Sequence, residues 1–153
     1  MCAFFIGDDM NNIYMKIAIT QATKAYKNGD VPVGCVIVKN NKIISKAYNK
    51  KEKNNNAIFH AEILAIKKAC NKLKTWHLND CILYTTLEPC VMCIGAIAQA
   101  RIKKVVYMYD NKKFGFTNYF SNNRITNHKI VVEKLELDNE YRQMLKTFFE
   151  MKR

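Results

Sequence analysis

Two short segments of the chain carry side chains that bind metal ions, and they are separated by about thirty residues. The first is His60-Ala61-Glu62 and the second is Pro89-Cys90-Val91-Met92-Cys93. Imidazole and thiolate are preferred zinc ligands, and a catalytic zinc site takes three protein ligands and leaves the fourth position for water. His60, Cys90 and Cys93 meet that count. If they bind one ion, the fold must bring the two segments together.

Both segments stand at the predicted start of a helix. Pro89 suits the first turn of a helix that reaches about Gln99, because its missing N–H has no partner there in any case. Two cysteines three apart in a first turn direct both sulfurs to one ion, and the helix N-terminus favours thiolate. Glu62 is not needed as a ligand. A carboxylate beside metal-bound water accepts its proton, which is what a hydrolytic site requires.

A CxxC by itself is also typical of structural zinc sites and redox pairs, and it can occur by coincidence. A structural site needs a fourth ligand, and neither His77 nor His128 falls at a zinc-finger spacing. We expect each of these to be a surface histidine or a hydrogen-bonded core histidine. A redox pair leaves His60 and Glu62 unexplained. The combined pattern, H-x-E followed by P-C-x-x-C, matches the signature of zinc-dependent deaminases.

Hydrophobic periodicity predicts helices and strands in alternation. After a ragged N-terminus, the first helix covers Ile13 to Tyr26 and is closed by Asn28-Gly29. We then expect strands at 33–38 and 43–48 with a turn at Asn40-Asn41, a loop at 50–56, a helix at 60–73, a strand at 81–85, a helix at 89–99, strands at 105–109 and 130–132 separated by an irregular Asn-rich stretch, and a helix at 139–152. This order predicts an α/β fold, a single three-layer α/β/α domain over residues 1–153 with a mixed central sheet of about five strands.

Composition and charge limit the class of protein. The 49% of hydrophobic residues excludes a disordered chain, and no apolar run reaches the ~18 residues of a membrane span. The apolar N-terminus is short and lacks a basic lead, so we expect no signal peptide. With 25 Lys+Arg against 13 Asp+Glu, the net charge of +12 favours a polyanionic partner such as nucleic acid or an anionic membrane surface. Lysine-rich coding is the alternative explanation of the charge, because 21 of the 25 cations are Lys.

The cysteines outside the CxxC are expected to be reduced, because no export signal is present. They stand singly, and three of them lie inside apolar segments, where a cysteine behaves as a small buried hydrophobe. These cysteines are Cys2, Cys35, Cys70 and Cys81.

The sequence resembles the cytidine/deoxycytidylate deaminase-like superfamily and, within it, the bacterial tRNA-specific adenosine deaminases. The resemblance covers roughly residues 12–152. It rests on Asp30-Val31-Pro32-Val33-Gly34, Tyr48-Asn49, Phe59-His60-Ala61-Glu62-Ile63, Thr85-Thr86-Leu87-Glu88-Pro89-Cys90-Val91-Met92-Cys93, Ala100-Arg101-Ile102 before Val105-Val106-Tyr107, Asn127-His128, and Phe148-Phe149. The form Leu-Glu-Pro-Cys-x-Met-Cys is more specific than PCxxC, which free-nucleoside and guanine deaminases share.

The resemblance implies a reaction and a role for each site residue. His60, Cys90 and Cys93 are implied as ligands of one Zn2+ per subunit, and Glu62 as the proton shuttle. Asn49 is implied to hydrogen-bond the target base, with Val33 lining the pocket. The implied reaction is hydrolysis of adenosine to inosine at the wobble position of a tRNA anticodon by zinc-activated water. Family members are homodimers that contact tRNA with both subunits. The resemblance therefore implies a cytoplasmic homodimer with tRNA as its partner and no membrane partner.

Aromatic and basic side chains are the further candidates for RNA contacts. Phe148 and Phe149 can stack on bases, although at helical spacing we expect one of them in the core. Trp76 is expected in the core. The candidate cations lie in the loop before His60 and on the last helix, and each is also explained as part of a solvated surface: Lys50, Lys51, Lys53, Arg142, Lys146, Lys152 and Arg153.

Several positions depart from the family pattern, and two other functions stay open. The departures are Ala57-Ile58-Phe59, Met108-Tyr109 and the Asn-rich stretch 116–126. None is a metal ligand, so we expect them to change how the RNA loop is held or how subunits meet. One alternative is a deaminase of a small free substrate (guanine, cytosine or a nucleoside), for which +12 has no use. The other is a catalytically silent zinc-bearing RNA-binding subunit, which has no need of Glu62.

Overall fold

Five strands form the central sheet, in the order β2-β1-β3-β4-β7. The computed structural model describes residues 2–120, 124, 125, 128–136 and 139–152. The strands of the sheet are β1 (Gly34–Lys39), β2 (Lys42–Tyr48), β3 (Cys81–Leu87), β4 (Lys104–Tyr109) and β7 (Val131–Lys134). β1 is antiparallel to both β2 and β3, whereas β3, β4 and β7 run parallel. The predicted mixed sheet of about five strands is confirmed.

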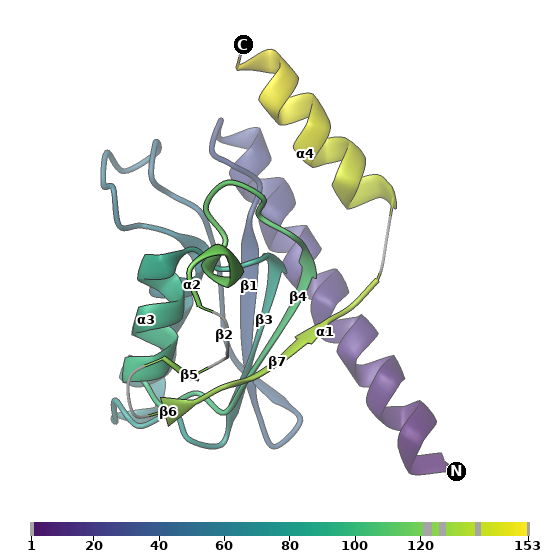
Figure 1. Cartoon of the computed structure of the whole chain (residues 1–153), viewed down its shortest axis with the longest axis vertical. Helices are drawn as coiled ribbons and strands as arrows, with labels where there is room; N and C mark the ends of the chain where they lie inside the picture. The colour runs from purple at the N-terminus through teal and green to yellow at the C-terminus, as the bar shows by residue number, and fades with distance from the viewer. Residues whose placement is uncertain (1, 121–123, 126–127, 137–138, 153) are drawn as a thin grey trace.

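Helices cover both faces of the sheet (Figure 1). α1 (Cys2–Lys27) and α4 (Asn139–Met151) lie on one face, where Met15, Val36 and Tyr141 belong to one buried cluster. α2 (Ala61–Leu73) and α3 (Val91–Gln99) lie on the other, where a second cluster includes Leu83 and Ile97. The sheet therefore separates two apolar cores, and the predicted three-layer α/β/α arrangement is confirmed.

The parallel strands end on one side of the sheet, and α2 and α3 begin on that side. β3 ends at Leu87 and is followed within a few residues by α3. Both helices begin with an extended N-cap residue, His60 for α2 and Cys90 for α3. In open α/β sheets, ligands bind outside the carboxyl ends of the strands. The fold thus brings the two metal-binding segments to the edge where a site is expected.

The first helix is longer than its sequence pattern predicts. α1 begins at Cys2, so the expectation of a ragged N-terminus before Ile13 was wrong. Helices in proteins owe most of their stability to tertiary packing, which overrides the low propensity of Asn11 and Asn12. The packing is close because Gly34 has no side chain: a Cβ there would lie 1.8 Å from the carbonyl oxygen of Ala18.

The hairpin turn was predicted correctly, and some element ends shift. Asn40 and Asn41 have φ of 50° and 59°, the left-handed conformation that a tight hairpin turn requires. α3 begins at Val91 and not at Pro89, because Cys90 has extended backbone angles. Between β4 and β7, the stretch expected to be irregular contains a 3-10 turn, η1 (Phe116–Asn118), and a two-stranded ladder of β5 (Arg124–Ile125) with β6 (His128–Lys129).

Trp76 is not in the core. Its side chain is 57% exposed in the turn after α2 and stacks on the ring of His77 at 3.6 Å between centroids. A neighbouring ring thus covers part of the indole, and no core position is needed. Cys35 and Cys81 are buried and Cys70 is half-buried, as free thiols, while the side chain of Cys2 lies outside the described residues. In the part of the chain that the structure describes, no helix has the length and apolar character of a membrane span.

Candidate metal centre and its cavity

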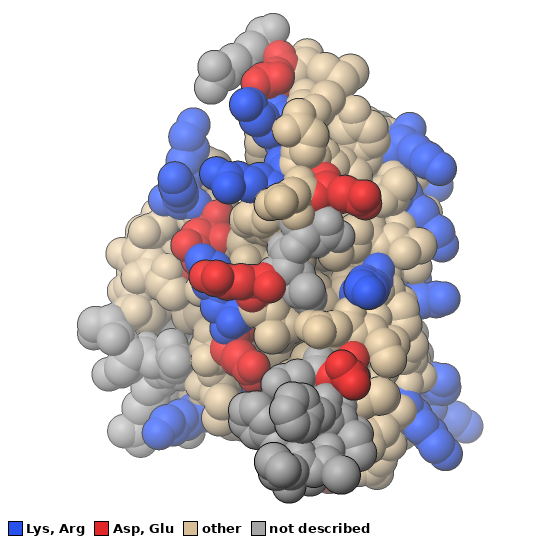
Figure 2. Space-filling model, turned by 90° about the vertical axis from the view of Figure 1, so that its right-hand side faces the viewer, with Lys and Arg blue, Asp and Glu red and all other residues tan. Residues whose placement is uncertain are grey.

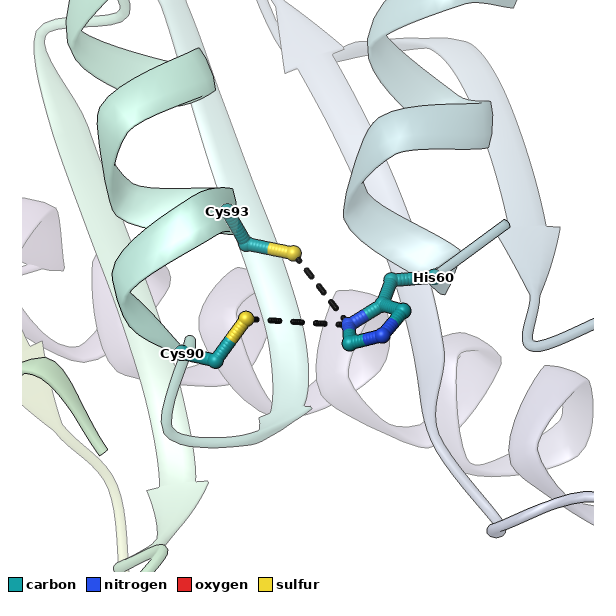
Figure 3. A group of neighbouring side chains, drawn as sticks. All are labelled: His60, Cys90 and Cys93. Carbon is teal, nitrogen blue, oxygen red and sulfur yellow. Dashed lines mark hydrogen bonds between the residues drawn. The ribbon is translucent and has the colours of Figure 1, made fainter. Parts of the chain in front are cut away.

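His60, Cys90 and Cys93 converge from the first turns of two neighbouring helices (Figure 3). Nδ1 of His60 lies 3.7 Å from Sγ of Cys90 and 3.6 Å from Sγ of Cys93. Among the described residues, these three form the group of metal-binding side chains with all ligand atoms within 4.8 Å of one another. The two segments identified in the sequence are therefore brought together as predicted.

The separations fit a tetrahedral zinc ion. With Zn–S near 2.3 Å and Zn–N near 2.0–2.1 Å, tetrahedral angles place an imidazole nitrogen and a thiolate sulfur about 3.6 Å apart. The two nitrogen–sulfur distances of the site are 3.7 and 3.6 Å. Three ligands of this type leave one coordination position free, as in catalytic zinc sites. The donor set thus fits zinc in both chemistry and spacing.

Hydrogen bonds within the cluster favour the thiolate form of Cys90. The pKa of Cys90 is lowered to about 4, mainly because the Cys93 thiol donates to its sulfur, with a further contribution from His60. The pKa of Cys93 is raised because its proton is held in that hydrogen bond and because the thiol is buried. The pKa of His60 is raised by its hydrogen bond to Cys90. Zinc binds neutral imidazole and thiolate, so the protons of the His60 ring and of the Cys93 thiol would be released when the ion binds.

Glu62 lies beside the ligands without joining them. Its side chain is 4% exposed in the first turn of α2, and its Oε2 lies 3.6 Å from Sγ of Cys93. Burial raises the pKa of the Glu62 carboxyl. A carboxyl whose pKa is raised holds a proton more readily and can still release it, which general acid–base catalysis requires. The position agrees with the role of proton carrier expected from the sequence.

A cavity of about 590 Å3 opens above these groups. His60, Glu62 and Cys90 contribute to its wall, whereas Cys93 is buried behind it. The four predicted substrate-binding residues line the same cavity: Val33, Asn49, Phe148 and Phe149. Of the two phenylalanines, Phe148 is 7% exposed and Phe149 is 50% exposed, which confirms that one of the pair packs in the interior. The structure therefore places every predicted site residue at one location.

The predicted cations divide into those at the cavity and those elsewhere. Lys51 and Lys152 line the cavity, and the Lys152 ammonium lies 5.6 Å from the centre of the Phe148 ring. Lys50 and Lys53 lie over the Tyr48 ring, at 4.9 and 5.9 Å from its centre. Arg142 and Lys146 do not line the cavity, and Arg153 lies outside the described residues. On the face drawn in Figure 2, basic side chains lie mainly along the margins, with acidic side chains between them.

Several residues at the cavity were not identified as site residues in the sequence, and two of them matter below. Phe114 and Glu88 both line it. Glu88 belongs to the motif before Cys90, but a buried carboxylate that binds loop backbone has no signature in the sequence. Phe114 is in a loop without hydrophobic periodicity, so no pattern indicates which way its ring points.

The comparisons with known proteins agree with this geometry. A family model described as MafB19-like deaminase matches residues 9–153. A tRNA-specific adenosine deaminase of Aquifex aeolicus is 42% identical over 139 residues, which are 89% of this chain and 91% of that protein. One from Bacillus subtilis is also 42% identical, covering 91% of this chain and 88% of that protein. The chain belongs to the tRNA-specific adenosine deaminase family.

Solved structures support the assignment to this deaminase family. A structure from studies of A-to-I editing by tRNA:A34 deaminases at the wobble position superposes with a TM-score of 0.77 at 32% identity, covering 81% of this chain and 98% of that one. A guanine deaminase from Bacillus subtilis superposes with a TM-score of 0.64, also at 32% identity, covering 92% of both chains. The adenosine deaminase relatives match this chain at the higher sequence identity.

Proposed function

We propose that this protein hydrolyses adenosine to inosine at the wobble position of a tRNA anticodon. The observation that carries the proposal is the cluster of His60, Cys90 and Cys93 with Glu62 beside it, at the wall of an open cavity. The 42% identity to tRNA-specific adenosine deaminases supports the choice of substrate. The net reaction consumes one water molecule and releases one ammonia.

His60, Cys90 and Cys93 are the residues that would hold the zinc ion. When bound there, zinc supplies a water molecule that is acidic enough to be used near neutral pH. The fixed first turns of α2 and α3 hold the three ligand side chains in place before a substrate enters.

Glu62 moves the protons of the reaction. Its buried carboxylate takes a proton from water and delivers it to N1 of adenine as the water oxygen adds to C6. The same carboxylate then takes the proton of the new C6 hydroxyl and passes it to the amino group, which leaves as ammonia as the C6 carbonyl forms. Burial favours this role because it raises the pKa of Glu62, so the group holds a proton more readily between the two transfers.

Asn49 and Val33 orient the base. The Asn49 side chain uses one N–H on the Val31 carbonyl and one oxygen lone pair on the Ala61 N–H, which leaves a second N–H and a second lone pair for the base. Val33 and Leu87 supply apolar wall and exclude water. The second N–H and the second lone pair of the Asn49 amide thus suit the polar edge of a purine.

An RNA loop suits the open cavity and the charge of the chain. Bases of an anticodon loop are unpaired and can be splayed into a pocket at lower cost than bases of a duplex. Lys51 and Lys152 at the cavity are available to the flanking phosphates. We further propose, from the family resemblance, that the chain is a single deaminase domain that acts as a cytoplasmic homodimer with one zinc ion per subunit.

The deciding experiment compares RNA with free substrates. Zinc-loaded protein is incubated with an anticodon stem-loop that has adenosine at the wobble position, and separately with adenosine, cytidine and guanine. The control stem-loop has guanosine at that position and adenosine elsewhere in the loop. We expect inosine only in the first RNA. Turnover of a free substrate without inosine in the RNA would overturn the proposal, and RNA binding without turnover would favour a catalytically silent subunit.

A further inference from the structure

Two exposed phenylalanine rings from different elements meet the cavity. Phe114, in the loop after β4, is 65% exposed, and Phe149, on α4, is 50% exposed. Both nevertheless line the cavity. Large apolar side chains with this much exposure bury little of their own surface within the chain, so both rings have a face available to a molecule that enters the cavity. Phe149 was a candidate in the sequence, whereas Phe114 has no assigned role.

The loop that carries Phe114 is anchored on a buried carboxylate. Glu88 is 3% exposed. Its Oε2 accepts a hydrogen bond from the Asn111 N–H at 3.0 Å, and its Oε1 accepts from the Thr117 N–H at 3.0 Å and the Thr117 hydroxyl at 2.6 Å. The side-chain oxygen of Asn111 in turn accepts a hydrogen bond from the Phe114 N–H at 3.1 Å. Both ends of the loop are thus fixed by one side chain.

The same anchor joins the loop to the metal-binding turn. Glu88 is two residues before the ligand Cys90, which forms a β-bridge with Gly115. The Phe116 N–H donates to the Pro89 carbonyl at 3.0 Å. The approach leaves no room for a side chain at Gly115, where a Cβ would lie 2.4 Å from the carboxyl carbon of Glu88. The backbone of the loop and the metal-binding turn are therefore held together.

We propose that Phe114 stacks on a base next to the target base in the RNA strand, and that Glu88 is the positioning residue that holds Phe114 there. The inference rests on the proposed function. A target base that enters the cavity brings its neighbours in the strand to the mouth, and every base has a face on which an aromatic ring can stack. Phe114 thereby makes the enzyme prefer a base within a strand over a free nucleoside.

The test removes one partner of the stack at a time. The RNAs are the anticodon stem-loop and two versions with an abasic nucleotide on the 5′ or the 3′ side of the target. Binding is measured by fluorescence anisotropy and deamination by kcat/KM. For the wild type, we expect one abasic RNA to lose about 10-fold in both measurements. Phe114→Ala should lose about as much on the intact RNA and nothing further on that abasic RNA.

Tyr119→Ala is the matched control, because Tyr119 is 63% exposed in the adjoining segment but does not line the cavity. It should retain the wild-type response to all three RNAs. The stacking role is wrong if Phe114→Ala remains as sensitive to the abasic RNA as the wild type, or if both alanine variants behave alike.

Glu88→Gln tests the positioning role. We expect it to keep its zinc, to lose activity mainly through a higher KM, and to lose sensitivity to the abasic neighbour. Added to Phe114→Ala, it should have little further effect on KM. Full additivity of the two substitutions would overturn the role of Glu88. If the wild type binds RNA in a Phe114-dependent way but forms no inosine, the proposed function fails and the stacking contact stands.

Discussion

The side-chain oxygen of Asn49 accepts a hydrogen bond of 2.7 Å from the backbone N–H of Ala61, the residue between His60 and Glu62. The amide nitrogen of Asn49 donates to the carbonyl of Val31 at 3.1 Å. Asn49 is 8% exposed, so water cannot easily replace either bond. A single side chain thus ties the end of β2 to the start of α2, and the position of a metal ligand and of the proton carrier depends on it.

Asn49→Ala should therefore weaken both the fold and the activity. It leaves the Ala61 N–H without its partner and removes one of the two donors to the Val31 carbonyl, so we expect the free energy of unfolding in urea to fall by about 1–3 kcal/mol. The control is Asn71→Ala on the exposed surface of α2, which should change it by less than about 0.5 kcal/mol. Equal losses in the two variants would show that the two hydrogen bonds of Asn49 contribute nothing to stability.

Glu62→Gln separates proton transfer from metal binding. The amide keeps the shape of the side chain but cannot carry the proton, so we expect kcat to fall by about 100- to 10,000-fold. Because Glu62 is not one of the ligands, the zinc content per chain should remain that of the wild type. Elemental analysis and a deamination assay on the same preparation check both statements, and loss of the metal would refute the assigned role.

Substitution of the cysteines should distinguish ligands from bystanders. Cys93→Ala removes a ligand and should abolish stoichiometric zinc binding and lower the melting temperature. Cys70→Ala, which changes a half-buried free thiol away from the cavity, should keep one zinc ion per chain. Removal of zinc from the wild type by a chelator should reproduce the lower melting temperature, and added Zn2+ should restore it. Equal zinc content in the two variants would contradict the ligand assignment.

The cations at the cavity should account for part of the salt dependence of RNA binding. Each phosphate contact on single-stranded nucleic acid contributes about 0.7 to the slope of log K against log salt. The double variant Lys51→Gln/Lys152→Gln should therefore reduce the slope by about 1.4 relative to the wild type. The matched control is Lys39→Gln/Lys42→Gln at the hairpin turn, at the far end of β1 and β2 from the cavity. An equal reduction in both would mean that only net charge matters.

The buried phenol of Tyr84 predicts a pH dependence of stability. Burial, assisted by Tyr14, raises the pKa of Tyr84 to about 12, and its hydroxyl donates to Asn11 at 2.6 Å. In the unfolded chain the pKa is about 10, so the folded state holds this proton more tightly. The contribution to stability is thus complete below pH ~10 and is lost as the pH rises through about 12.

We accordingly expect the difference in unfolding free energy between the wild type and Tyr84→Phe to be largest near pH 9 and to shrink toward pH 11. Urea titrations at both pH values check this. A difference that stays constant would show that Tyr84 does not titrate differently in the folded and unfolded states.

The metal ligands could be predicted from the sequence because each is tied to a local signal. Cys90 and Cys93 have a spacing that suits two ligands of one ion at the start of a helix, and His60 precedes a periodic apolar segment that marks α2. Likewise, Asn40-Asn41 between two β-rich runs specifies a hairpin turn through its own backbone preferences. In these cases the local chemistry and the tertiary structure require the same conformation.

Features that depend on tertiary contacts could not be predicted. α1 begins at Cys2, well before the apolar period at Ile13 that marks this helix in the sequence. Trp76 lies outside the core, where its ring stacks on that of His77. Phe114 reaches the cavity because Glu88, more than twenty residues earlier in the chain, holds the backbone of its loop. The sequence contains these residues, but it does not indicate which other residues they contact in the fold.

Glu88 holds the loop that carries Phe114 through main-chain atoms. It accepts hydrogen bonds from the N–H groups of Asn111 and Thr117 and packs against the backbone of Gly115. Those contacts make no demand on the side chains of residues 112–114. The loop is accordingly a region where sequence can drift, or be randomised in a library, while its path over the cavity is retained. Altered preference for neighbouring nucleotides is thus open to evolution and to engineering without any change to the metal ligands.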